Sequence, residues 1–448
     1  MPNTARSIPA AMPNDLSNFF MPFTANRAFK KRPRLISRAK GLYYYTAEGR
    51  PVLDGAAGLW CTNAGHNHPR IVAAIQEQAN ELDFAPSFNF SHPIAFQAAS
   101  RIAELAPGNL DSVFFCNSGS EAVDTALKIA IAYQRVRGQA QKTRLIGRER
   151  GYHGIGMGGI SVGGIMANRK QFHSMMIPGV DHLAHTYDRE KQAYSKGSPE
   201  YGAHFADDLE RIVALHDAST IAAVIVEPMA GSTGVLPPPK GYLKRLREIC
   251  TKHDILLIFD EVITGFGRTG SAFASITEGV TPDLFTFAKG VTSGTVPMGG
   301  VVCRKDIYET LMQGPEHVVE FCHGYTYSAH PLACAAAIAR MDVYRDEKLF
   351  ENAKAIETTW QDAIYGLKGL PNVLDIRQYG LTAGIDLASR PDAYGKRAYD
   401  ALETGFHDVG IVVRSTGETI ALTPPLTMTA NDVDKIADML AKIIRAVA

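Results

Sequence analysis

The chain has 448 residues, of which 46% are hydrophobic, enough for one large buried core and a second, smaller one. Lys plus Arg and Asp plus Glu each number 46, so the formal net charge is zero, and no basic tract is present. These values exclude strongly basic nucleic-acid binders and membrane-surface binders, and because no apolar run reaches about 18 residues we expect no transmembrane helix.

Residues 1–20 contain no charged region followed by a long apolar core, so we expect no signal peptide. The six cysteines are scattered and form no C-x-x-C pair. This pattern favours reduced thiols in a cytoplasmic protein over a disulfide or zinc framework. The H-E-x-x-H motif is also absent, and we expect no catalytic metal.

Short apolar runs alternate with helical patterns through the middle of the chain. The strand-like runs are Val113–Cys116, Leu145–Ile146, Ile221–Val226, Ile255–Phe259, Leu284–Phe287 and Gly300–Cys303, with amphipathic segments such as Lys240–Lys252 between several of them. Strand–helix alternation predicts an α/β fold with a mostly parallel sheet. We expect residues 60–330 to form this large domain. Residues 1–59 and 331–448 would fold together as a smaller α/β domain.

A possible anion site follows the first of these strands. Ser118, Gly119 and Ser120 stand between the strand and a helical segment. Glycine permits a tight turn, and a helix N-terminus offers free N–H groups and the positive end of its dipole. Such a turn suits a cofactor phosphate. Alone, it is more typical of an ordinary serine N-cap.

A second glycine-rich stretch, 154–159, matches the G-x-G-x-x-G pattern of dinucleotide-binding loops, and Asp181 follows it. Its context argues against that function. Gly147–Arg148–Glu149–Arg150 separates the stretch from any apolar strand, and no clear apolar helix follows. We therefore assign it no nucleotide-binding function.

Two chemically active residues follow neighbouring apolar runs. Asp260 directly follows Ile255–Phe259, and Lys289 comes two residues after Leu284–Phe287. Ligands of open α/β sheets bind outside the carboxyl ends of the strands, so both side chains should project into one crevice. A lysine that forms a Schiff base and an acid that pairs with a pyridinium nitrogen are the groups that pyridoxal phosphate requires.

The motifs as a set resemble the class III aminotransferases of the fold type I pyridoxal-phosphate superfamily, over nearly the whole chain. The motifs are NSGSEA, GYHG, VEP, FDEVITGFGRTG, AKG and GYTYSAHP. Within that class, segments such as MPFTANRAF, GLWCTNAGH and LPPPKGYLKRLREIC are most similar to β-alanine (ω-amino acid):pyruvate aminotransferases.

The resemblance implies a role for each matching position. Lys289 would form the Schiff base with pyridoxal 5′-phosphate, and Asp260 would pair with the ring nitrogen. The other cofactor-binding positions would be Ser118, Gly119, Ser120, Tyr152, His153, Glu227, Val262 and Thr326. The threonine matches one that reaches the phosphate of a partner subunit, which implies a homodimer, or a dimer of dimers, with shared active sites.

The substrate-binding residues are predicted from positions at which this chain differs from other class III aminotransferases. Ornithine- and 4-aminobutyrate-type relatives place a carboxylate-binding arginine where this chain has Ala421, and a glutamate in the region of Gly231–Thr233. Here Arg414 stands upstream, before an expected loop, Ser415–Gly417. We expect it to bind the pyruvate carboxylate. Phe23, Trp60, Phe88 and Tyr152 would line an apolar pocket that admits an amine without an α-carboxylate.

The implied activity is ping-pong transamination from a small-molecule amine to pyruvate, which gives an aldehyde or ketone and L-alanine. Lys289 would act as the general base and Asp260 would keep the ring nitrogen protonated. Other class III donors, such as taurine or a diamine, stay open, as does an isomerase or decarboxylase on the same fold. A non-catalytic homologue would lack a usable lysine at position 289.

Overall fold

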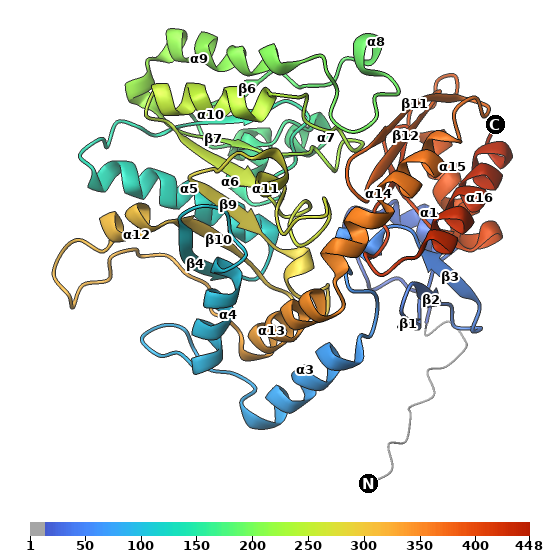
Figure 1. Cartoon of the computed structure of the whole chain (residues 1–448), viewed down its shortest axis with the longest axis horizontal. Helices are drawn as coiled ribbons and strands as arrows, with labels where there is room; N and C mark the ends of the chain where they lie inside the picture. The colour runs from blue at the N-terminus through green and yellow to red at the C-terminus, as the bar shows by residue number, and fades with distance from the viewer. Residues whose placement is uncertain (1–13) are drawn as a thin grey trace.

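The computed structural model describes residues 14–448, which form a larger and a smaller lobe (Figure 1). The expectation for residues 1–20 falls largely outside this range. No helix within residues 14–448 is both long and apolar enough to cross a bilayer.

A seven-stranded sheet forms the centre of the larger lobe. Its order is β4 (Leu110–Cys116), β10 (Gly299–Arg304), β9 (Leu284–Phe287), β8 (Leu256–Asp260), β7 (Ile221–Val226), β5 (Arg144–Arg148) and β6 (Val180–Leu183). All neighbours from β9 to β6 are parallel, whereas β10 runs antiparallel to both β4 and β9. The predicted mostly parallel sheet is therefore confirmed, with one reversed strand and an additional strand, β6, that the sequence analysis did not anticipate.

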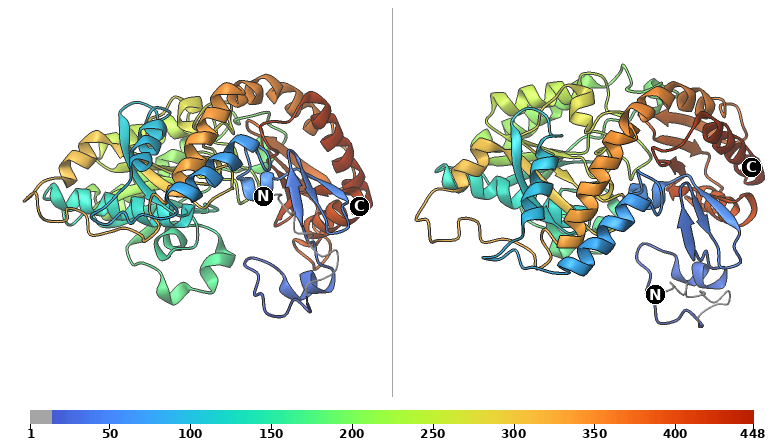
Figure 2. Two further views of the ribbon diagram at one scale, coloured as in Figure 1. Left: turned by 90° about the horizontal axis from the view of Figure 1, so that it is seen from below. Right: turned by 60° about the horizontal axis from the view of Figure 1, so that its bottom comes forward.

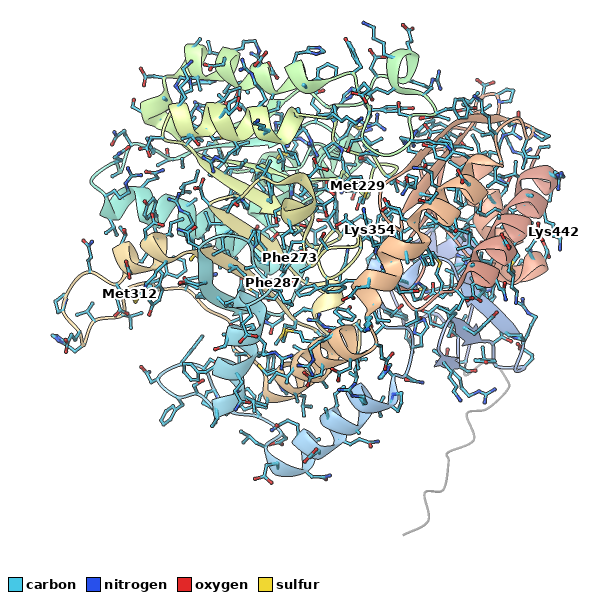
Figure 3. The ribbon with its side chains drawn as sticks, viewed as in Figure 1. Met229, Phe273, Phe287, Met312, Lys354 and Lys442 are labelled. Carbon is cyan, nitrogen blue, oxygen red and sulfur yellow. The ribbon has the colours of Figure 1, made fainter. Side chains whose placement is uncertain are left out.

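The predicted apolar runs form the middle of this sheet because both of its faces are covered. All six residues of β7 are buried, and so are all residues of β8 and β9. Strands buried on both faces lose the alternation of polar and apolar residues that marks a half-exposed sheet. Phe273 and Phe287 lie inside the larger lobe among the aromatic residues of this core (Figure 3).

Helices cover the sheet. Helix α5 packs against β10, β9 and β7, α4 packs against β4, and α10 packs against β8. The helices of this lobe are α3 (Pro69–Glu81), α4 (Pro93–Ala103), α5 (Gly119–Val136), α6 (Met157–Val162), α7 (Met166–Lys170), α8 (Arg189–Gln192), α9 (Asp208–His216), α10 (Tyr242–Lys252), α11 (Ala274–Glu278) and α12 (Lys305–Leu311).

The smaller lobe joins the two ends of the chain. Strands β1 (Arg38–Lys40), β2 (Tyr43–Tyr45) and β3 (Pro51–Asp54) form one sheet with β13 (Ile411–Val412), which pairs in parallel with β3. A second sheet has the order β11 (Val373–Gln378), β12 (Ala383–Leu387), β15 (Thr419–Leu422) and β14 (Arg414–Thr416). Helices α1 (Asn26–Lys31), α14 (Leu349–Tyr365), α15 (Lys396–Thr404) and α16 (Ala430–Ala446) complete it (Figure 2).

Helix α13 (Pro331–Asp346) runs between the lobes and packs against α3 and α4 of the larger one. The pairing of β3 with β13 supports an N-terminal segment that folds with the C-terminal one. The domain limits 1–59, 60–330 and 331–448 stay a prediction. They assign α13 to the smaller domain, although α13 packs against helices α3 and α4 of the larger lobe.

Candidate active site

A cavity of about 530 Å³ opens at the carboxyl ends of β8 and β9, between the two lobes. Its volume lies in the range of small-molecule sites. The structure brings most of the predicted site residues to this cavity, namely Phe23, Trp60, Gly119, Ser120, Tyr152, His153, Glu227, Asp260, Val262, Lys289 and Arg414.

Asp260 is the last residue of β8 and is almost completely buried. Its Oδ1 accepts hydrogen bonds from the Thr286 hydroxyl (3.0 Å) and the Val262 N–H (3.2 Å). Its Oδ2 lies 2.8 Å from His153 Nδ1. The outer ring nitrogen of His153, Nε2, is buried without a partner within the described residues. The carboxylate is thus oriented from three sides, and the parallel pairing of β8 with β9 places Thr286 opposite Asp260.

Lys289 begins a single 3-10 turn, η4 (Lys289–Val291), two residues after the end of β9. Its backbone is left-handed, with a φ of 51°, which is uncommon for a non-glycine residue and is concentrated at functional sites. The pKa of its amine is lowered from 10.5 to about 8, mainly by burial and to a smaller extent by the charge of Arg414. A carboxylate within reach, Asp260, opposes this effect. About half of the amine is therefore in its neutral, nucleophilic form near pH 8.

The N-terminus of α5 faces the same cavity. Ser118 caps the helix by accepting a hydrogen bond from the Glu121 N–H at 3.2 Å, so its side chain has the ordinary capping role and does not line the cavity. The first N–H groups of a helix have no partner within it, which leaves those of Gly119 and Ser120 for an anion. A Cβ on Gly119 would lie 3.0 Å from a methyl group of Val262, so glycine keeps this approach open.

Glu227 connects two walls of the cavity. Its Oε1 accepts a hydrogen bond from the Tyr152 N–H at 2.9 Å, and its Oε2 accepts one from the Gly231 N–H at 3.0 Å. Burial raises the pKa of this carboxyl group. Glu227 thereby fixes the backbone beside Tyr152, whose ring would face a cofactor in the cavity.

The substrate side of the cavity carries Phe23, Trp60 and Arg414. Trp60 is buried in one small apolar cluster that also contains Ala421. The expected loop at Ser415–Gly417 was wrong. Residues 414–416 form strand β14, paired antiparallel with β15, and only the residues after Thr416 turn, with a φ of 53° at Gly417. Arg414 therefore projects from a strand.

Besides Ser118, two predicted residues do not line this cavity in the single chain. Phe88 is 55% exposed and lies beside Gly324, where a Cβ would come within 2.9 Å of its ring. Thr326 belongs to the same segment, next to the exposed Tyr327. Both residues thus lie together at the surface. Their predicted roles stay predictions that a second subunit would have to fulfil.

Sequence reasoning missed several residues of the site. Thr286 orients Asp260, and its only signal was its place in β9 opposite the acid. Cavity residues that the sequence did not single out are Pro22, Thr24, Leu59, Ile165, Asn168, Ser232, Ile263 and Thr416, although all but Ile165 and Asn168 lie in segments noted above. Most of them lie on loops or short helices, where no periodic pattern indicates which side chains face inward.

The glycine-rich stretch 154–159 has a packing role. A Cβ on Gly156 would lie 2.3 Å from a carboxylate oxygen of Asp124 on α5, and one on Gly159 would lie 2.2 Å from the His153 carbonyl. The Gly159 N–H donates to Asp124 Oδ1 at 2.8 Å. The glycines let this segment lie against α5 and hold His153 in place, in agreement with the sequence argument against a dinucleotide.

The residues of the cavity fit pyridoxal phosphate. A buried carboxylate with a histidine behind it suits a protonated ring nitrogen, a lysine of lowered pKa suits an imine, and the free N–H groups of α5 suit a phosphate. These three features surround one cavity that is large enough for the cofactor and a small substrate.

Comparisons with known proteins agree with this site. Residues 24–444 match the aminotransferase class-III family. The chain is 58% identical to an omega-aminotransferase of Caulobacter vibrioides, covering 96% of this chain and 98% of the relative. It is 48% identical to an omega-amino acid–pyruvate aminotransferase of Pseudomonas putida, covering 96% of each. It also superimposes with a TM-score of 0.91 on the omega transaminase of Pseudomonas jessenii in complex with PMP, at 31% identity and 97% coverage of each chain.

The fold and the site define a fold type I pyridoxal-phosphate-dependent transferase. The chain belongs to the class III aminotransferases. Both the predicted family and the predicted cofactor, pyridoxal 5′-phosphate, are thereby confirmed.

Proposed function

We propose that this aminotransferase moves the amino group of an ω-amino acid or primary amine, of the β-alanine type, to pyruvate, and releases L-alanine. The observation that carries the proposal is Arg414. Among the described residues it is the one arginine that lines the cavity. No carboxylate of the described part of the chain contributes to the shift of its pKa, so its guanidinium has no nearby counter-charge. Burial lowers its pKa, as expected for a guanidinium without a counter-charge.

An unpaired guanidinium at the mouth of the cavity suits the carboxylate of pyruvate or β-alanine, because its fork donates two parallel hydrogen bonds. Ala421 stands where the resemblance places the arginine of ornithine- and 4-aminobutyrate-type relatives, so this chain has no second arginine there, and Ala421 belongs to the same buried apolar cluster as Trp60. The name of the Pseudomonas putida relative, an omega-amino acid–pyruvate aminotransferase, supports the same pair of substrates.

The reaction follows from the positions of three side chains. When bound, pyridoxal phosphate supplies a conjugated cationic ring that withdraws electrons from the substrate carbon. Asp260, held by His153 and Thr286, keeps a negative charge where the ring nitrogen needs its proton. Lys289, with a pKa lowered to about 8, binds the cofactor and then serves as the base that moves a proton at the substrate carbon. Tyr152 and Val262 line the same cavity and would restrict a ring bound there.

A panel of amine donors tests the proposal. Pyruvate should accept amino groups from β-alanine and simple arylalkyl amines, and 2-oxoglutarate should accept them poorly. Loss of amine without pyruvate would instead indicate the isomerase or decarboxylase alternative, and a preference for taurine or a diamine would identify another donor within the class.

Arg414→Ala gives the sharper test of the carboxylate site. KM for pyruvate and for β-alanine should rise about 10- to 150-fold, the value of a charge-assisted hydrogen bond of about 1.5–3 kcal/mol. The half-reaction with an arylalkyl amine, which has no carboxylate, should change far less. Arg414→Lys is the matched control, because it keeps the charge but loses the fork. Equal weakening of both half-reactions would show that the carboxylate binds elsewhere.

We also propose that the active form is at least a homodimer in the cytoplasm. The surface that carries Phe88 and Tyr327 is unusually apolar for an exposed surface, and includes Phe84, Phe90 and Phe96. A second subunit covering it would bury these rings and bring Phe88 and Thr326 close to an active site. The six free cysteines are in keeping with a reducing compartment.

A further inference from the structure

The segment that carries Leu59 and Trp60 into the cavity has a strained backbone. Between β3 and Cys61, three residues adopt left-handed conformations: Ala57 with a φ of 43°, Gly58 with 65° and Trp60 with 67°. Alanine and tryptophan avoid this region unless their surroundings hold them there. Leu59 and Trp60 both line the cavity. Something outside the segment must therefore fix its shape.

Asp54, the last residue of β3, fixes the shape of this segment by hydrogen bonds to its backbone. It is fully buried and does not line the cavity. Its Oδ1 accepts a hydrogen bond from the Ala56 N–H at 3.1 Å, and its Oδ2 accepts one from the Gly58 N–H at 2.7 Å. Oδ2 also lies 2.7 Å from His66 Nε2. One carboxylate thus holds two of the N–H groups that the left-handed turn leaves without partners.

Thr423, which follows β15 in the smaller lobe, holds the same segment by its carbonyl groups. Its N–H donates to the Gly55 carbonyl and its hydroxyl to the Ala56 carbonyl, both at 2.9 Å. The segment is thus held by Asp54 through the N–H groups of Ala56 and Gly58, and by the C-terminal part of the chain through the C=O groups of Gly55 and Ala56. The hydrogen bonds to Asp54 stabilise the segment more than those to Thr423, because hydrogen bonds to a charged group are worth more than those between neutral groups.

From this arrangement we infer that Asp54 is a specificity-determining positioning residue, which sets the shape of the amine pocket through Leu59 and Trp60. The inference rests on the proposed function, because it assigns this wall to the amine side chain. Asp54 acts on the substrate only through the segment. A short ω-amino acid held by Arg414 depends little on the position of Trp60, whereas an arylalkyl amine must fit against it.

Asp54→Asn removes one of the hydrogen bonds that fix the segment and keeps the others. The amide oxygen can still accept from the Ala56 N–H, and the amide NH2 can donate to His66 once that ring changes its tautomer. The Gly58 N–H then faces a donor and loses its acceptor. We expect kcat/KM for an arylalkyl amine to fall at least about tenfold, as for loss of a hydrogen bond to a charged group, with less than about a threefold fall for β-alanine.

A second readout needs neither substrate nor cofactor. The chain has two tryptophans, Trp60 and Trp360, and Trp360 is buried in the smaller lobe with its Nε1 donating to the Thr382 carbonyl at 3.1 Å. In the cofactor-free protein, acrylamide quenching of tryptophan fluorescence should therefore increase in Asp54→Asn through Trp60. Thr423→Val, which removes the hydroxyl bond to Ala56, should produce a smaller change of the same kind and carries the test if Asp54→Asn does not fold.

Tyr43→Phe is the control, because on the neighbouring strand β2 it removes only the hydroxyl that accepts from Lys435 Nζ at 2.8 Å, while both bonds from Asp54 to the segment stay in place. It should leave quenching and the selectivity ratio unchanged. Unchanged quenching in both Asp54→Asn and Thr423→Val would overturn the inference. An equal fall in kcat/KM for both amines would also overturn it. Failure of the wild-type enzyme to use pyruvate would contradict the proposed function and leave the fluorescence result to decide the role of Asp54.

Discussion

Replacement of Asp260 by asparagine removes a charge from the site while keeping its shape. The amide oxygen of the new side chain can accept the hydrogen bonds that Oδ1 now receives from Thr286 and Val262. The amide NH2 would face His153 Nδ1, which must then accept, so that the ring proton moves to Nε2. That atom is buried without a partner among the described residues, so the change leaves one buried N–H unsatisfied but opens no cavity.

The expected loss is electrostatic. Without a negative charge at this position the ring nitrogen of the cofactor does not keep its proton, and the substrate carbon loses its electron acceptor. Removal of one pre-organised electrostatic group in an active site reduces the rate by about 10²–10³, or about 2.7–4 kcal/mol. We expect turnover to fall by this amount. The assay is the amine half-reaction, followed by absorbance in single-turnover experiments at saturating cofactor.

Thr286→Val is the matched control for this prediction. It removes the 3.0 Å hydrogen bond to Oδ1 but leaves the charge and the His153 contact. Loss of one hydrogen bond is worth about 1 kcal/mol, or about fivefold in rate. Near-normal turnover of Asp260→Asn, or an equal loss in Thr286→Val, would refute the assignment of the charge.

The other predictions concern the lysine and the assembly. Lys289→Ala should abolish turnover, and borohydride should no longer fix the cofactor to the protein; covalent trapping in this variant would show the lysine assignment to be wrong. The pKa of Lys289 is lowered from 10.5 to about 8, so its amine loses its proton as the pH rises through about 8. The rate at which the cofactor-free protein captures pyridoxal phosphate should therefore rise with pH and be half-maximal near pH 8. A midpoint near pH 10 would contradict this prediction. Light scattering should show at least a dimer under assay conditions, and an active monomer would exclude a site that needs Phe88 or Thr326 of a second subunit.

Local sequence patterns determined the main chemical groups of this protein. An apolar run long enough for a buried strand ends at Asp260, another ends just before Lys289, and a serine–glycine turn precedes a helix at Gly119. Each of these features depends on residues close together in the chain. The edge of a parallel sheet then brings them together, so the position of the active site followed from the order of strands and helices.

The tertiary structure decided how these groups are held and where the substrate wall lies. His153 orients Asp260 across 107 residues of sequence, and Asp54 and Thr423 hold the segment before Trp60 from opposite ends of the chain. Arg414 lies on a strand, where a serine, threonine and glycine sequence favoured a loop, because pairing with β15 outweighs the weak local preference of these residues. Such contacts depend on strand order, register and close packing, which residues distant in sequence determine together and no local pattern contains.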